Sequence, residues 1–171
     1  TNLITQSELF SNAYWTKSGA SVTSGQLSPK GDTSAFKLVE DTSTGKHFFA
    51  TPVFSLTSGN KYSISFYIKA DSISKIGIIE ATTSGIGISV DLSNENIISN
   101  YGNVYSSLIT RMTNGYYRVS FSFTTTGVNN SFRFSLLDDL FNSSSIRPDN
   151  YSYTGDGTSG VYIYGAQVEQ Q

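Results

Sequence analysis

The stretch Lys61–Asp71 reads KYSISFYIKAD, and its even-numbered residues are hydrophobic while its odd-numbered residues are Lys, Ser, Tyr or Asp. Successive side chains of a strand point to opposite faces, so this alternation predicts a half-buried strand about ten residues long. Tyr116–Thr125 and Ser131–Leu137 repeat the pattern. Three such strands favour a sandwich with one buried face on each sheet.

The rest of the chain carries weaker strand signals separated by turns. Further strands are predicted at Asn2–Thr5, Ala35–Glu40, Lys46–Phe54, Lys75–Ala81, Ile86–Asp91, Val104–Met112 and Val161–Val168. Gly beside Ser, Asn, Asp or Thr marks the turns between them. Phe10–Trp15 forms one helical turn at most, and Asn142–Thr158 is predicted as one long loop. The sequence therefore predicts a single all-β domain over residues 1–171, an antiparallel β-sandwich (jelly roll) with under about a tenth of its residues in helix.

Composition and charge exclude several classes of protein. The 171 residues carry a net charge of −2, and 14% of them are charged. The chain has no basic run, so we expect no nucleic-acid partner. No apolar stretch approaches the roughly 18 residues of a membrane span, so we expect no membrane partner. The chain contains no Cys and shows no signal-peptide pattern, which suggests a mature or excised fragment, or export by another route.

The residues give little support for catalysis. His47 is the only His, and neither a serine elbow nor a glycine-rich oxyanion turn accompanies it. Asp138 and Asp139 form the obvious carboxylate pair, but adjacent strand residues point to opposite faces and cannot flank one bond. We therefore expect a protein that is not an enzyme.

Sugar binding matches the outward faces of the predicted strands. Aromatic rings cover the C–H faces of a saccharide, and charged groups bond its hydroxyls. The candidate carbohydrate-binding residues are Tyr67, Lys69, Arg118, Arg133, His47, Tyr116 and Trp15. The alternatives are plain cross-strand packing for the stripe, a core position for Trp15, and for His47 a strand residue that points into a groove or is partly buried.

The placement of the predicted glycan depends on which strands share a sheet. If the three strong strands lie in one sheet, Tyr67, Arg118 and Arg133 emerge on one face, and His47 could join them. Such a cationic face would favour an acidic polysaccharide, because Arg pairs with carboxylate or sulfate in bidentate fashion. The aromatic loop Tyr151–Tyr153 is the second choice of site.

Five motifs, in order along the chain, resemble a jelly-roll carbohydrate-binding module. They read NLITQSELFSNAYWTK at 2–17, SPKGDTSAFKL at 28–38, KYSISFYIKA at 61–70, NGYYRVS at 114–120 and GDGTSGVYIYGAQVE at 155–169. Modules of this kind occur in bacteriophage tail and virion proteins and in polysaccharide-active proteins. Tyr116 and Tyr164 stand where the module has Trp.

The resemblance implies a fold and a function. The fold is a galactose-binding-like β-sandwich. The function is a non-catalytic module that anchors a larger multidomain protein or virion to a polysaccharide or cell-surface glycan, outside the cell or on the virion surface. The alternative is a structural decoration or adaptor domain of a phage tail or capsid that binds no glycan.

The resemblance also implies a structural Ca²⁺ ion. First and last strands of a sandwich often pair, which would bring Glu8 near Glu169. With carbonyls of the turn Lys30–Asp32, these carboxylates would supply oxygen ligands of the kind that Ca²⁺ prefers.

Overall fold

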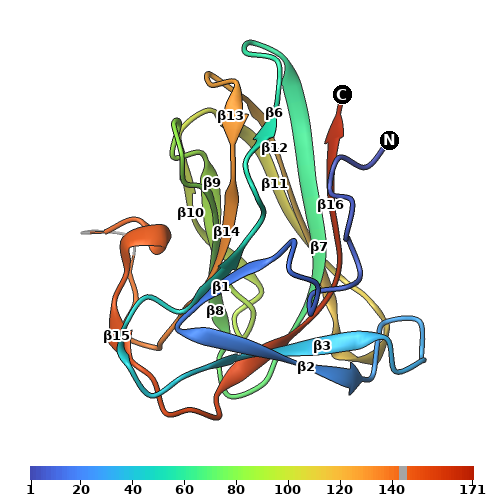
Figure 1. Ribbon diagram of the computed structural model, residues 1–171, viewed down its shortest axis with the longest axis vertical. Coiled ribbons are helices and arrows are strands. Elements are labelled where there is room, and N and C mark those ends of the chain that lie inside the picture. Colours follow the sequence, from blue (N-terminus) through green and yellow to red (C-terminus); the bar gives the residue numbers. More distant parts are fainter. Residues whose placement is uncertain (143–145) are drawn as a thin grey trace.

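The computed structural model describes residues 1–142 and 146–171 and folds as two antiparallel sheets of six strands, packed face to face (Figure 1). Strands hold 52% of the residues and helices 4%, which confirms the all-β prediction. The first sheet has the order β1 (Thr16–Ser18), β5 (Phe48–Ala50), β14 (Phe132–Leu137), β8 (Lys75–Glu80), β9 (Gly87–Asp91) and β10 (Asn96–Tyr101). The second has the order β11 (Val104–Arg111), β12 (Tyr117–Thr124), β7 (Lys61–Ala70), β16 (Gly160–Gln170), β3 (Ala35–Glu40) and β2 (Ala20–Gln26).

Short elements complete the fold. β6 (Phe54–Ser55) pairs with β13 (Asn129–Asn130), and β4 (Thr44–Gly45) pairs with β15 (Tyr153–Thr154). The helices are the 3-10 turns η1 (Thr113–Gly115) and η2 (Pro148–Asn150). None of the described helices has the length and hydrophobicity to span a membrane.

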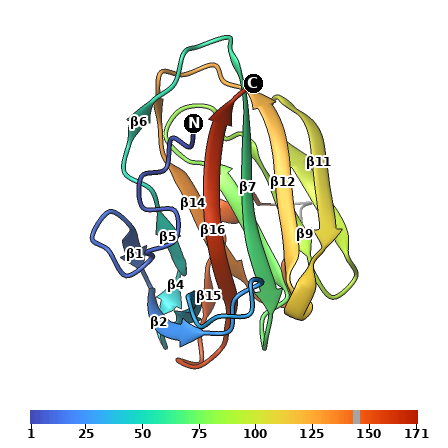
Figure 2. The same ribbon diagram turned by 90° about the vertical axis from the view of Figure 1, so that its right-hand side faces the viewer.

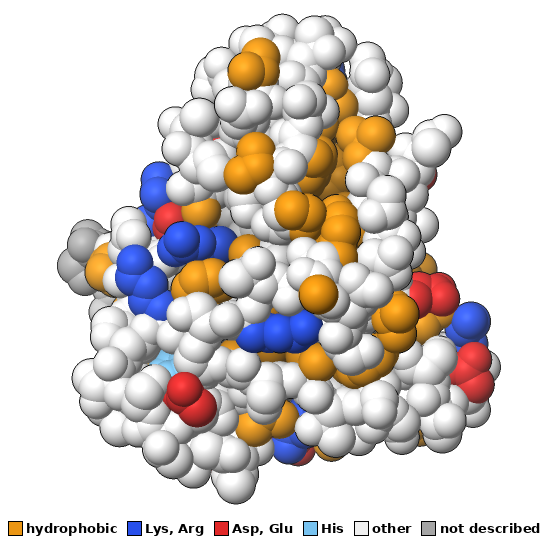
Figure 3. Space-filling model, viewed as in Figure 1, with side chains coloured by type: hydrophobic (Ala, Val, Ile, Leu, Met, Phe, Trp, Pro, Cys, Tyr) orange, Lys and Arg blue, Asp and Glu red, His pale blue; other side chains and the backbone are white. Residues whose placement is uncertain are grey.

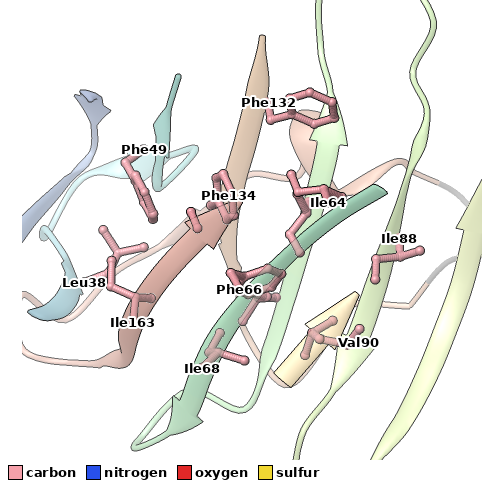
Figure 4. Packing of buried hydrophobic residues seen from close by; sticks show 14 of the residues in the cluster. Leu38, Phe49, Ile64, Phe66, Ile68, Ile88, Val90, Phe132, Phe134 and Ile163 are labelled. Atoms are coloured by element: carbon pink, nitrogen blue, oxygen red, sulfur yellow. The ribbon is translucent and has the colours of Figure 1, made fainter. Parts of the chain in front are cut away.

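The core lies between the two sheets and draws on the inward face of each (Figure 4). Phe66 of β7 meets Phe134 of β14 edge to face, with ring centroids 5.3 Å apart. Phe134 also stacks on Phe49 of β5 at 4.9 Å. Because Phe66 and Phe134 reach the core from opposite sheets, the side chains next to them in sequence point outward on opposite sides of the molecule.

Three predicted elements differ from the structure. Asn2–Thr5 forms no strand, although the Leu3 N–H donates to the Val168 carbonyl oxygen at 2.8 Å and holds the segment beside β16. Lys46–Phe54 is interrupted near Pro52, whose missing N–H cannot join a ladder. The loop predicted at Asn142–Thr158 contains η2 and β15, and its residues 143–145 lie outside the described part.

A buried carboxylate organises the turn after β8. Glu80 is fully buried and accepts hydrogen bonds from the N–H groups of Thr82 (2.9 Å) and Ser84 (2.8 Å) and from the Ser84 hydroxyl (2.7 Å). The Ser131 N–H, next to β14, donates to the same carboxylate at 3.3 Å. Burial raises the pKa of Glu80, but the hydrogen bonds from the hydroxyl and N–H groups of Thr82 and Ser84 outweigh it and lower the pKa to about 2.

Candidate functional site: an aromatic pocket on the second sheet

The strands β12, β7 and β16 lie side by side in the second sheet (Figure 2). Their outward face carries aromatic and cationic side chains from all three strands. Tyr67 of β7 lies opposite Tyr164 of β16 on one side and Arg118 of β12 on the other. Two residues further along β7, on the same face, Lys69 lies opposite Tyr162 of β16. The tyrosines form a small cluster of their own, separate from the main core. This confirms the predicted outward positions of Tyr67, Lys69 and Arg118 on one sheet.

A segment between β2 and β3, residues Leu27–Lys30, lies across this face and is called the strap below (Figure 2). Three consecutive strap carbonyls accept hydrogen bonds from the connection between β11 and β12. Their donors are the Tyr116 hydroxyl to Leu27 (2.7 Å), the Asn114 amide to Ser28 (3.1 Å) and the Thr113 hydroxyl to Pro29. The strap is therefore fixed over the sheet by bonds to its own backbone.

The strap closes one wall of a pocket of about 360 Å³. Tyr67, Tyr164 and Gly165 line its floor, and its walls are Ser7, Glu8, Pro29, Lys30, Met112, Thr113 and Gln167. Gly165 has a φ of +56°, where a bulge in β16 interrupts the pairing with β7. A Cβ at this glycine would lie 3.3 Å from the Tyr67 ring, so glycine lets the ring pack against the strand.

Tyr164 contacts one negatively charged and one positively charged side chain. Its hydroxyl donates to the Glu8 carboxylate at 2.7 Å, and the Lys30 ammonium lies 5.3 Å from its ring centroid. Burial, followed by the contact with Glu8, raises the pKa of Tyr164, so the hydroxyl keeps its proton at neutral pH. The interaction with Tyr164 also raises the pKa of Lys30. The pocket thus offers the half-buried ring of Tyr67, a floor formed by Tyr164, which is only 6% exposed, a carboxylate acceptor and an ammonium donor.

The prediction for Arg133 is wrong about the face it shares. Its strand, β14, lies in the first sheet, whereas β7 and β12 lie in the second. Arg133 is half-buried and places its guanidinium 4.4 Å from the Phe48 ring centroid, on the far side of the sandwich. The alternation of hydrophobic and polar residues is the same in all three strands, so it does not tell which sheet each strand joins. The prediction required all three strands to share one sheet, and they do not.

Three other predicted binding residues are buried. His47, Trp15 and Tyr116 are each no more than 2% exposed, so none can stack on a glycan. The Trp15 indole N–H donates to the Gln6 carbonyl at 2.9 Å while its ring packs on Phe49. Trp15 is thus a core residue, the alternative that the sequence had left open.

His47 and Tyr116 support the backbone of other segments. His47 places Nδ1 at 2.6 Å from the Gly19 carbonyl oxygen and Nε2 at 3.0 Å from that of Tyr153. Tyr116 holds the strap through its bond to Leu27, so it acts on the pocket through that segment. Burial raises the pKa of Tyr116 well above its ordinary value. Strand alternation placed Tyr116 outward, and the strap covers it. His47, which could have joined that face, lies between β4 and β5 and is covered by the segments of Gly19 and Tyr153.

The predicted calcium ligands do not converge. Glu8 bonds Tyr164, whereas Glu169 lies five residues further along β16 and beside Ser63 of β7. Within residues 1–142 and 146–171, no three His, Cys, Asp or Glu side chains form a group that could hold a metal. A calcium ion therefore stays a prediction of the sequence, and these two glutamates do not fit it as joint ligands.

The second-choice site is also placed by the structure. The Tyr151 hydroxyl donates to Asp138, and its ring packs edge to face on Phe141. Tyr153 is buried and contacts the His47 ring at 4.5 Å. The rings of Tyr151 and Tyr153 are therefore occupied by contacts within the protein.

Two residues of the Tyr67–Tyr164 pocket, Lys30 and Met112, were not among the predicted binding residues. Both lie where the chain leaves regular strand alternation.

Comparisons with known proteins agree on the fold. No family model matches the chain, and no curated protein does. The carbohydrate-binding module TmCBM61, solved with β-1,4-galactotriose, is similar over 100% of this chain and 99% of its own, with a TM-score of 0.56 and 9% identity. The enzymatically active domain of bacteriophage CBA120 tailspike protein 4 gives 0.54 at 15% identity; 99% of this chain is covered, but only 21% of the tailspike chain. The CBM22-1–GH10 modules of Clostridium thermocellum xylanase 10B, solved with xylohexaose, give 0.50 at 12% identity over 92% of this chain and 26% of theirs. The chain therefore has the jelly-roll β-sandwich found in carbohydrate-binding modules, as its motifs predicted.

Proposed function

We propose that this chain is a non-catalytic carbohydrate-binding module that holds a saccharide in the pocket above Tyr67 and Tyr164. The observation that carries the proposal is the meeting of two tyrosine rings, Glu8 and Lys30 in one hollow. Rings cover the C–H face of a sugar, a carboxylate accepts from its hydroxyls, and an ammonium donates to its oxygens. TmCBM61 and the xylanase modules, solved with galactotriose and xylohexaose, support the same use of this fold.

The biological role we propose is to anchor a larger protein or virion to a polysaccharide outside the cell. Lys30, Lys69 and Arg118 on this face favour an acidic polysaccharide, and Glu8 is the carboxylate within the pocket. An open pocket of this size suits affinities between about micromolar and millimolar, so several copies would be needed for firm attachment.

Tyr67→Ala tests the pocket. A glycan array that includes β-1,4-galacto-oligosaccharides, xylo-oligosaccharides and uronic-acid glycans identifies a ligand, and calorimetry measures its affinity. We expect Tyr67→Ala to weaken binding at least about tenfold, because truncating an aromatic anchor costs more than about 1.4 kcal/mol. Tyr105→Ala is the matched control, since Tyr105 is exposed on β11 of the same sheet and bonds Gln171 instead.

The opposite result would favour the adaptor hypothesis. If the folded chain binds no glycan on the array, a protein partner becomes the better candidate, and the edge strand β11 with its exposed Leu108 offers a docking surface for one. If Tyr67→Ala and Tyr105→Ala weaken binding equally, the glycan lies outside the pocket.

A further inference from the structure

The strap divides the outward face of the second sheet into two hollows. Pro29 and Lys30 line the pocket described above, whereas Gln26 and Leu27 line a second hollow of about 140 Å³ on the other flank. Lys69 and Tyr162 complete this second hollow. Because Tyr162 and Tyr164 are two residues apart on β16, their positions are separated by about 7 Å along the strand. Neighbouring residues of one glycan could therefore reach both hollows.

Two lysines flank the ring of Tyr162, and both interact electrostatically with the Asp71 carboxylate, but only Lys37 forms a direct ion pair with it. The Lys37 ammonium lies 5.8 Å from the ring centroid and is paired with the Asp71 carboxylate at 2.7 Å. The Lys69 ammonium lies 5.7 Å from the same centroid. Among the described residues Lys69 takes part in no ion pair within 4.0 Å. Lys69 is therefore a half-buried cation whose head is not neutralised by direct pairing with a carboxylate.

The stem of Lys69 is held in place by its surroundings. Gly115, at the end of η1, has a φ of +79°, and a Cβ there would lie 3.2 Å from the Lys69 Cε. The stem thus passes close to the backbone of the connection that also fixes the strap. A lysine with a confined stem loses less side-chain entropy on pairing with a ligand than a free surface lysine does.

We propose that this second hollow binds the carboxylate or sulfate group of an acidic sugar residue, next to the residue that occupies the Tyr67–Tyr164 pocket. The Lys69 ammonium supplies the charge, the Gln26 amide lies within the hollow as a further hydrogen-bonding group, and the Tyr162 ring offers an apolar surface. Hydrogen bonds between ionised partners are the stronger ones, so this group would favour acidic over neutral glycans. The inference rests on the proposed function, because it extends the same glycan beyond the first pocket.

Calorimetry with three probes tests the inference: neutral β-1,4-galactotriose, α-1,4-trigalacturonate for the carboxylate and a chondroitin sulfate tetrasaccharide for the sulfate. Lys69→Met keeps the stem and removes the charge. We expect it to weaken binding of at least one acidic probe about tenfold and to change the galactotriose affinity less than about twofold. It should also reduce the salt dependence of acidic binding. The two acidic probes separate carboxylate from sulfate recognition.

Two further variants sharpen the test. Lys61→Met is the matched control, because Lys61 lies on the same strand, over the Tyr105 ring at 5.2 Å, far from the strap. Asp71→Asn releases Lys37 toward Tyr162 and should raise the affinity for the acidic probe. If Lys69→Met and Lys61→Met have equal effects while Tyr67→Ala still weakens binding at least about tenfold, the second hollow is not a subsite and the proposed function stands. If the parent protein binds none of the three probes, both ideas fail for these glycans.

Discussion

Glu80→Ala is expected to lower the free energy of unfolding by about 3–5 kcal/mol at neutral pH, because it removes the buried carboxylate that several partly buried N–H groups share as their acceptor. The N–H groups of Thr82, Ser84 and Ser131 all donate to this one carboxylate. Since about 1 kcal/mol moves the melting temperature of a chain this size by about 2–4 °C, we expect the melting temperature to fall by about 6–20 °C. Urea unfolding at pH 7 measures it, with Glu169→Ala, an exposed carboxylate on β16, as the control.

The same residue predicts how stability depends on pH. The folded state lowers the pKa of Glu80 from 4.5 to about 2, so the charged form stabilises the fold. That contribution is fully present above pH 4.5 and is lost as the pH falls through about 2, and it amounts to about 3 kcal/mol. Glu80→Gln should therefore show a flatter stability profile between these pH values. A variant with the parent's acid profile would show that other carboxylates cause the slope.

Phe134→Ala is expected to cost about 3–5 kcal/mol, since it opens a cavity between the two sheets. The Phe134 ring has centroid distances of 4.9 Å to Phe49, 5.3 Å to Phe66 and 5.9 Å to Trp15 (Figure 4). Phe134→Leu retains most of the apolar volume and should cost clearly less. Denaturant titration of both variants measures the difference. A loss below about 1 kcal/mol for Phe134→Ala would mean that the neighbouring rings collapse into the space.

Phe134 also shows what alternation in the sequence can decide. The pattern placed Phe66, Phe121 and Phe134 in the core, and all three are buried. It could not assign β14 to the first sheet, because strand pairing depends on contacts between residues far apart in the chain. The prediction that Arg133 points away from the core is therefore correct, but Arg133 lies on the outer face of the first sheet and not on that of the second.

The candidate site was predictable only where strands supply it. Tyr67, Lys69 and Arg118 follow from period-two alternation, and the structure brings them together. Glu8 and Lys30 come from irregular segments whose path is fixed by hydrogen bonds, such as those of the strap. Such segments show no regular alternation of hydrophobic and polar residues, so the sequence does not predict where their side chains point. His47 was predicted to lie within the strand Lys46–Phe54, but it lies just before β5, where the carbonyl oxygens of Gly19 and Tyr153 meet its ring nitrogens and the residue is buried.

Charge is sparse on the side of the molecule that Figure 3 presents, where hydrophobic side chains form a band and charged ones stand singly or in small groups. This agrees with the composition of the chain, in which only 14% of the residues are charged. Near the strap, Lys30 and Lys37 are paired with Asp32 and Asp71, so Lys69 is the lysine of this group without a carboxylate within 4.0 Å among the described residues. Its charge is felt by a ligand within a Debye length of about 8 Å.

The two chain ends lie side by side at one end of the sandwich (Figure 1), where the Leu3 N–H meets the Val168 carbonyl oxygen. The strap and its hollows lie toward the opposite end of β16, near Tyr162 and Tyr164. A domain whose ends lie side by side can be inserted into a surface loop of a host protein, because the chain enters and leaves the domain at nearly the same place. The end that carries the strap and its hollows would then project away from the host. Under the proposed function, several copies on one scaffold could bind a long polymer at several points.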